Sequence, residues 1–180
     1  MGHLEIREAS PGQAPELAAL ARVIWREHFT PIIGAAQVEY MLGRFQSEEA
    51  VRGQMEREGF RYFFFLWDGE RAGYLCFRPE ADALFLSKLY VRKEFRGRKI
   101  ARAATDFLLG ICREKKLGAV RLTCNKHNAP SLAAYRALGF RTVRPQVTPI
   151  GGGFVMDDYV LEQPVPAAKN QTEMKEDSVL

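Results

Sequence analysis

Helical and extended hydrophobic spacing alternate in the first third of the chain. Residues 4–8 favour a strand, and a turn at 10–12 leads into a helix from about Pro15. The apolar residues of this helix that recur at helical spacing are Leu17, Leu20, Ala21 and Ile24. A second helical region is expected from about Ala36 to Glu58. The segment between them, Trp25–Gly34, contains aromatic residues, a proline and a glycine, and this predicts a structured loop.

From Phe60 the apolar spacing changes to that of strands, as far as Val91. The runs Tyr62–Trp67 and Gly73–Phe77 flank an Asp-Gly pair, which predicts an antiparallel hairpin. The longer run Leu84–Val91 is apolar enough for a central strand that is buried on both faces.

The clearest helix begins near Ile100, since apolar residues recur at helical spacing as far as Cys112. A strand over Ala119–Cys124 follows. A short helix is then expected from an N-cap at Asn128 to Gly139, which favours a left-handed C-terminal residue. The final pair of predicted strands, Phe140–Val147 and Phe154–Leu161, is joined through three consecutive glycines.

Length and composition predict one globular domain over residues 1–163 and a flexible polar tail over residues 164–180. Apolar residues make up 47% of the chain and charged residues 27%, which argues against a disordered or fibrous protein. No apolar run approaches the ~18 residues of a membrane span, and no signal peptide is recognisable, so we expect a cytoplasmic protein without membrane association.

Three cysteines without CxxC spacing indicate neither a disulfide framework nor a zinc site. We therefore expect no bound metal. The cysteines are interpreted as small, buried apolar side chains.

A net charge of +4 suits nucleic acid or any phosphate-bearing ligand, so the position of the charge matters more than its size. The densest cluster follows the predicted central strand and contains Arg92, Lys93, Arg96, Arg98, Lys99 and Arg102. A basic loop that leads into a helix start directs backbone N–H groups and the helix dipole at one point. Such an arrangement predicts an anion site suited to a pyrophosphate.

Two ordered motifs place this chain beside a known family. The stretch Arg96-Gly97-Arg98-Lys99-Ile100-Ala101 resembles the loop Gln/Arg-x-x-Gly-x-Gly/Ala of the GCN5-related N-acetyltransferase (GNAT) superfamily. Residues 128–140 resemble its second motif, Asn-x-x-Ala/Ser-x-x-x-Tyr-x-x-x-Gly-Phe. Lys99 replaces the usual glycine, and it either adds a phosphate contact or weakens cofactor binding.

The resemblance implies an α/β (α+β) GNAT fold. Its central sheet is mixed but mostly antiparallel, with six to seven strands flanked by about four helices. The fourth and fifth strands, ending at Val91 and near Cys124, splay apart in a V, often with a bulge in the first of them.

The resemblance also implies acetyl-CoA as cosubstrate, with its pantetheine arm in the V. The implied cofactor-binding residues are Leu89, Tyr90, Val91, Arg96, Gly97, Arg98, Lys99, Ile100, Ala101, Arg102, Asn128, Ser131 and Tyr135. Tyr135 would donate a proton to the departing thiolate, and a backbone N–H near Leu89 or Tyr90 would stabilise the oxyanion.

Sequence spacing marks no single base for the acceptor amine. Glu39, Asp157 and Asp158 are the candidates, while Trp25 and Tyr40, together with Glu39 and Asp158, are candidate substrate contacts. Several relatives place a glutamate at the position of Ser87-Lys88. Its absence here leaves open a water-mediated route or a base from another element.

The expected function is transfer of an acetyl group to a primary amine of a small molecule. A polyamine-type acceptor is favoured, because the first half is loosely similar to bacterial spermidine/spermine acetyltransferases. Alternatives are a protein or peptide amine and a non-catalytic acetyl-CoA sensor. A nucleic-acid-binding module is disfavoured because no recognition motif accompanies the basic cluster. A homodimer stays open.

Overall fold

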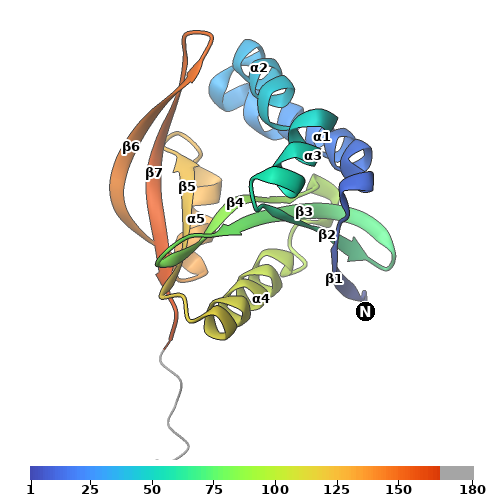
Figure 1. Cartoon of the computed structure of the whole chain (residues 1–180), viewed down its shortest axis with the longest axis vertical. Coiled ribbons are helices and arrows are strands. Elements are labelled where there is room, and N and C mark those ends of the chain that lie inside the picture. The colour runs from blue at the N-terminus through green and yellow to red at the C-terminus, as the bar shows by residue number, and fades with distance from the viewer. Residues whose placement is uncertain (167–180) are drawn as a thin grey trace, which may run out of the picture.

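A single seven-stranded sheet runs through the structure, a computed structural model that describes residues 1–166 (Figure 1). The strand order is β1-β2-β3-β4-β5-β7-β6, and every neighbouring pair is antiparallel except β4 and β5. The strands are β1 (Leu4–Glu8), β2 (Arg61–Trp67), β3 (Glu70–Pro79), β4 (Ala83–Val91), β5 (Ala119–Asn125), β6 (Arg141–Gly151) and β7 (Phe154–Pro164). The expected tail begins at Pro164, the last residue of β7, and residues 167–180 lie outside the described part.

Five α-helices within residues 1–166 cover the sheet. They are α1 (Ala14–Ile33), α2 (Ala35–Phe45), α3 (Glu48–Arg57), α4 (Ile100–Lys115) and α5 (Ala129–Ala137), with short 3-10 turns at Pro11–Gln13 and Lys93–Phe95. Helices α1 to α3 lie over one face of β2–β4, and α4 lies against the opposite face (Figure 1). The two buried clusters thus sit on opposite sides of the same strands, which explains why β2 and β3 read as nearly continuous apolar runs.

The V between β4 and β5 is confirmed. The two strands are parallel and pair only over Ala83–Phe85 and Ala119–Arg121. Beyond these pairs, β4 continues to Val91 beside β3 and β5 continues to Asn125 beside β7. The register of β3 against β4 shifts at Ser87, where β4 carries one extra residue, so the expected bulge is also present.

Arg121 holds the closed end of the V together. Its guanidinium donates to Glu162 on β7 at 2.7 Å and to Asp82 in the β3–β4 turn at 3.0 Å. Glu80 lies 3.6 Å away as a third partner. Carboxylates from β7 and from the β3–β4 turn therefore meet at one half-buried cation, and the hydrogen bonds from Asp82 and Glu162 raise the pKa of Arg121.

The loop predicted over Trp25–Gly34 is wrong, because α1 continues to Ile33. Pro31 cannot donate a helical hydrogen bond, but it stands so close to the helix end that little of the ladder is lost. Helical spacing carries Trp25 and Phe29 onto Tyr90, with ring centroids 5.6 and 5.7 Å from the tyrosine. Packing of these aromatics thus overrides the proline.

The predicted helical region Ala36–Glu58 is interrupted at Gln46. This side chain is buried and accepts from the Tyr74 hydroxyl at 2.7 Å while donating to Tyr62 at 3.1 Å. Ser47 then caps α3 through the Ala50 N–H. The break adds one helix to the expected four.

The cysteines Cys76, Cys112 and Cys124 are free and buried, as expected. No helix within residues 1–166 is long and apolar enough to cross a membrane. Within the same residues, no three His, Cys, Asp or Glu side chains gather as a metal-binding group.

Gly73 allows β3 and β4 to approach closely beside Tyr90, and we expect Gly73→Ala to destabilise the fold. An added Cβ would lie 2.1 Å from the Tyr90 carbonyl oxygen, so the backbone must shift. Overpacking of this kind costs about 1–3 kcal/mol in the free energy of unfolding, measured by urea titration. Gly110→Ala on α4 meets no atom within 4 Å and is the control, expected to gain about 0.5–1 kcal/mol. Equal midpoints for the two variants would contradict the close approach.

Candidate active site

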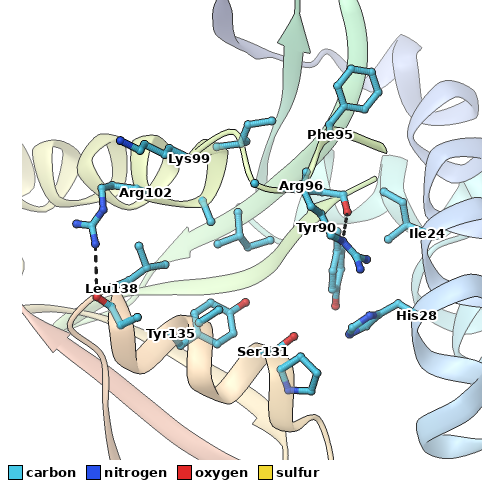
Figure 2. A pocket seen from close by; sticks show the side chains of 18 residues that line it. Ile24, His28, Tyr90, Phe95, Arg96, Lys99, Arg102, Ser131, Tyr135 and Leu138 are labelled. Atoms are coloured by element: carbon cyan, nitrogen blue, oxygen red, sulfur yellow. Dashed lines mark hydrogen bonds between the residues drawn. The ribbon is translucent and has the colours of Figure 1, made fainter. Parts of the chain in front are cut away.

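A cavity of about 490 Å³ lies in the open end of the V, between β4, α4 and α5, with α1 as a fourth wall (Figure 2). We call it the donor cavity. Its lining residues are Ile24, His28, Leu89, Tyr90, Val91, Phe95, Arg96, Gly97, Lys99, Ile100, Ala101, Arg102, Pro130, Ser131, Ala134, Tyr135, Ala137 and Leu138. All the residues expected to bind the cofactor are among them except Arg98 and Asn128.

The start of α4 forms an anion site at the donor cavity. Lys99 is the N-cap residue, with φ of 61° in the left-handed region, and Gly97 has φ of 77°. The chain changes direction at these two residues, beside the cavity, and α4 begins there. The first N–H groups of this 16-residue helix have no partners within the helix. The conformation of Lys99 also explains why glycine is usual in the motif there: a lysine in this region costs about 1–2 kcal/mol.

The basic side chains of the loop divide into two groups. Arg92 pairs with Glu70 and Glu94, and the Arg98 guanidinium lies over the Trp67 ring, 5.1 Å from its centroid. In contrast, Arg96 and Arg102 line the cavity, and Figure 2 shows Arg102 reaching from α4 to α5, where it donates to the Ala137 carbonyl at 3.4 Å. Only part of the basic cluster therefore faces the cavity.

His28 lines the donor cavity but was not predicted as a site residue. It follows Ile24 by one helical turn on α1, and both face the cavity. Burial and the nearby Arg96 charge lower the pKa of His28. Extending the α1 pattern past Trp25 would have placed His28 on the same face as Ile24, so the signal was hidden by the loop prediction.

A second, smaller cavity of about 260 Å³ adjoins the first, and we call it the acceptor cavity. It is lined by Trp25, Phe29, Ile33, Gln37, Met41, Phe45, Phe85, Ser87, Lys88, Tyr90, Thr123, Cys124, Asn125, Asn128, Ser131, Tyr135, Met156 and Asp158. Tyr90, Ser131 and Tyr135 line both cavities. A molecule in one cavity therefore meets a molecule in the other at these three residues.

Tyr135 stands at this junction on α5, with its hydroxyl directed toward the cavity (Figure 2). Burial raises its pKa well above the usual value, and the Cys124 thiol adds to the shift. The hydroxyl is therefore protonated at neutral pH and serves as a hydrogen-bond donor.

The two aspartates of β7 point to opposite faces, as successive strand residues must. Asp158 is buried in the acceptor cavity, and burial, helped by the neighbouring Asp157 charge, raises its pKa to about 6. Asp157 lies outside both cavities and pairs with Lys126 at 2.8 Å. Of the two, only Asp158 is placed to meet an acceptor.

Asn128 occupies the N-cap position of α5, but its side chain makes no capping hydrogen bond. Its Oδ1 is buried, and no donor in the described residues forms a hydrogen bond of good geometry with it, although the His28 ring lies beside it. An unsatisfied buried acceptor is costly, so it suits a ligand N–H.

Two of the other acceptor candidates lie outside the cavity. Glu39 is exposed on α2 and pairs with Arg26 at 2.7 Å. The Tyr40 hydroxyl donates to the Ile150 carbonyl at 2.7 Å, close to the β6–β7 turn. Trp25 does line the acceptor cavity, although its indole N–H is bound to Tyr74.

The hairpin of β6 and β7 covers one side of the acceptor cavity. Its tip lies beside α2 (Figure 1), where Tyr40 and Gln37 of the helix bond Ile150 and Val155. Gly151, with φ of 91°, lets the strand pass over the Tyr40 hydroxyl, since an added Cβ would lie 2.4 Å from it. The hairpin is thereby tied to α2 at two points.

Comparisons with known proteins agree with this arrangement. An uncharacterised N-acetyltransferase in the pepI 3′ region of Lactobacillus delbrueckii subsp. lactis is 23% identical over 159 residues, covering 84% of this chain and 92% of that protein. Among solved structures, the PaiA N-acetyltransferase of Thermoplasma acidophilum in complex with coenzyme A gives a TM-score of 0.75 at 20% identity, covering 90% of this chain and 99% of that one.

The ribosomal-protein-S18-alanine N-acetyltransferase of Escherichia coli gives a TM-score of 0.65 at 18% identity, covering 94% of this chain and 98% of that one. At these identities the two structures establish the fold. The profile of the Acetyltransferase (GNAT) family matches residues 19–140, well over half of the sequence. This chain is therefore a member of the GNAT family of acetyl-CoA-dependent N-acetyltransferases.

Proposed function

We propose that this chain transfers the acetyl group of acetyl-CoA to a primary amine of a small molecule, with both substrates bound at once. The observation that carries the proposal is the meeting of the donor and acceptor cavities at Tyr90, Ser131 and Tyr135. A thioester held in the V and an amine held beside β7 would approach each other there. Holding two reactants in this way is a large part of catalysis.

The donor cavity has the groups that a coenzyme A molecule needs. The start of α4, with Arg96 and Arg102, suits the pyrophosphate, and the V leaves the edge of β4 free for backbone hydrogen bonds with the pantetheine arm. The Asn128 oxygen borders the acceptor cavity, and it suits an amide of that arm where the arm reaches the junction of the two cavities.

A small acceptor fits the enclosed acceptor cavity better than a protein does. The cavity volume of about 260 Å³ is below the ~300–1,000 Å³ usual for drug-sized ligands. Helix α2 and the β6–β7 hairpin, joined through Tyr40 and Gln37, narrow the approach. A folded protein acceptor would have to separate them.

The residues at the junction suggest how protons move. The ammonium of the acceptor must lose two protons, one before attack and one as the amide forms. Asp158 would take the first. The second would reach the departing sulfur through the Tyr135 hydroxyl, which ends the reaction protonated. Because the pKa of Tyr135 is raised, hydrogen bonding to the sulfur is the main contribution that we assign to it.

The cellular location and the oligomeric state of the protein are less constrained than its chemistry. A cytoplasmic location, the absence of a bound metal and a homodimer stay predictions from the sequence.

Lys99 should assist coenzyme A binding at the cost of backbone strain. We expect Lys99→Gly to raise the free energy of unfolding by about 1 kcal/mol, because glycine adopts positive φ freely. The same variant, and Lys99→Asn, should weaken coenzyme A binding by about 3- to 10-fold in calorimetry, since each removes a positive charge at the residue that begins α4 beside the cavity. Unchanged affinity in both would mean that the ammonium makes no phosphate contact.

Tyr135→Phe should lower kcat by about 100-fold, because the departing sulfur loses its hydrogen-bond donor, while coenzyme A affinity changes little. Thiol release from acetyl-CoA over a panel of amines measures the first quantity and calorimetry the second. Tyr159→Phe, on β7 and outside both cavities, is the matched control. Tight cofactor binding without thiol release in the wild-type protein would instead support a non-catalytic acetyl-CoA sensor.

Asp158 should set the acidic limb of the pH profile. It accepts a proton only when ionised, so kcat/KM should fall as the pH drops below about 6, the pKa of this carboxyl. Asp158→Asn should remove that limb and lower kcat/KM by about 100-fold, whereas Asp157→Asn removes the same charge from the opposite face and should change it less than about twofold. An acidic limb that survives in Asp158→Asn would assign the base elsewhere.

A further inference from the structure

The acceptor cavity contains a cation where an amine substrate is expected. Lys88 follows the bulge residue of β4, and both Ser87 and Lys88 line the cavity. The bulge turns Lys88 to the face of β4 that also carries Tyr90, since Leu86 and Leu89 belong to the core on the other face. A positively charged side chain is thereby built into the wall of the cavity.

No carboxylate balances this charge. None of the ion pairs formed within residues 1–166 includes Lys88. The Lys88 ammonium donates to the Ser87 hydroxyl at 2.5 Å, and the residue opposite it on β3 is the buried Cys76. Burial lowers the pKa of Lys88, because the charged form loses hydration there. A half-buried, unpaired cation costs free energy, and an anionic ligand would remove that cost.

The negative group of the cavity lies at a different place. Asp158 lies on β7 opposite Asn125, at the end of β5, which is one arm of the V. Lys88 lies opposite Cys76 on β4, which is the other arm, beyond the last residue that pairs with β5. Lys88 and Asp158 form no ion pair with each other within the described residues. The acceptor cavity is therefore bipolar, with its negative group on the β7 side and its positive group at the bulge of β4.

We infer that the acceptor carries an anionic group, a carboxylate or a phosphate, in addition to its primary amine. The ammonium would lie at Asp158 and the anionic group at Lys88. This inference rests on the proposed transferase function and narrows its substrate class. It also argues against the polyamine-type acceptor, because a second ammonium would face Lys88 in a weakly solvated cavity, where like charges repel strongly.

Matched acceptors test the inference directly. Each pair presents the same amine with and without the anion: a series of ω-amino acids against their methyl esters, and phosphoethanolamine against ethanolamine, with putrescine as the dication. We expect kcat/KM to be about 10- to 100-fold higher for the anionic member of the best pair, the range of one charge-assisted hydrogen bond. Whichever series shows the larger ratio distinguishes a carboxylate from a phosphate.

Variants at Lys88 connect that ratio to the residue. Lys88→Met keeps the length and apolar stem of the side chain, and it should bring the ratio to about one, chiefly through KM of the anionic member. Lys88→Arg should keep most of the ratio, and the exposed Lys115→Met should leave it unchanged. Tyr135→Phe should slow both members equally. A ratio that Lys88→Met does not alter, or equal slowing of both members in that variant, would overturn the inference.

Calorimetric titration of the same pairs into the enzyme loaded with coenzyme A separates the two proposals. Turnover without any preference for the anionic member sinks the inference and leaves the transferase proposal standing. Binding that prefers the anionic member and is lost in Lys88→Met, without turnover of any amine, supports the recognition site and sinks the transferase proposal. If the enzyme shows no binding preference and no turnover, both the inference and the transferase proposal are overturned.

Discussion

The rest of the site depends on one constraint, which is that β4 and β5 share hydrogen bonds over only three residues each before they separate. Had the pairing continued, the edge of β4 would be satisfied by β5, and the donor cavity would be filled by sheet. Separation alone would leave backbone groups unpaired at a cost, and a ligand with amide groups is one way to satisfy them. The bulge at Ser87 contributes to the same geometry, because it twists β4 and changes which of its side chains face the acceptor.

Charge is distributed unevenly around this opening. Although the loop after β4 is the most basic part of the chain, Arg92 is satisfied by glutamates and Arg98 by aromatic rings. The field at the donor cavity therefore comes from fewer side chains, together with the start of α4. The charged residues that line the acceptor cavity are Asp158 and Lys88. Their charges nearly cancel in sum, but they lie at separate positions. Counting charges along the sequence could not have shown either distribution.

The sequence predicted most of the elements because their periodicity is local. Helix α4 and the strand pattern of β2 to β5 follow directly from apolar spacing. The extension of α1 past Trp25 was missed, because a proline near a helix end is tolerated when aromatics such as Phe29 find a partner across the core.

Site residues follow a different rule, because periodicity shows which residues share a face but not which face borders a cavity. Glu39 and Tyr40 are on α2 as expected, yet the helix turns them toward Arg26 and the β6–β7 hairpin. The choice between Asp157 and Asp158 depends on the pairing of β7 with β5, which is a long-range property. At Ser87-Lys88 the sequence showed only that the glutamate of several relatives is missing, because the direction of the Lys88 side chain depends on where the bulge falls.

Arg121 gives the V a fixed vertex. Because it ties β5, β7 and the β3–β4 turn together at the closed end, the strands diverge from a point that cannot easily slide. Because the two strands diverge from this fixed point, a small change in the angle between them at Arg121 becomes a larger change in their separation at the open end, several residues away. The gap between β4 and β5 at the donor cavity therefore depends partly on an ion cluster whose residues line neither cavity.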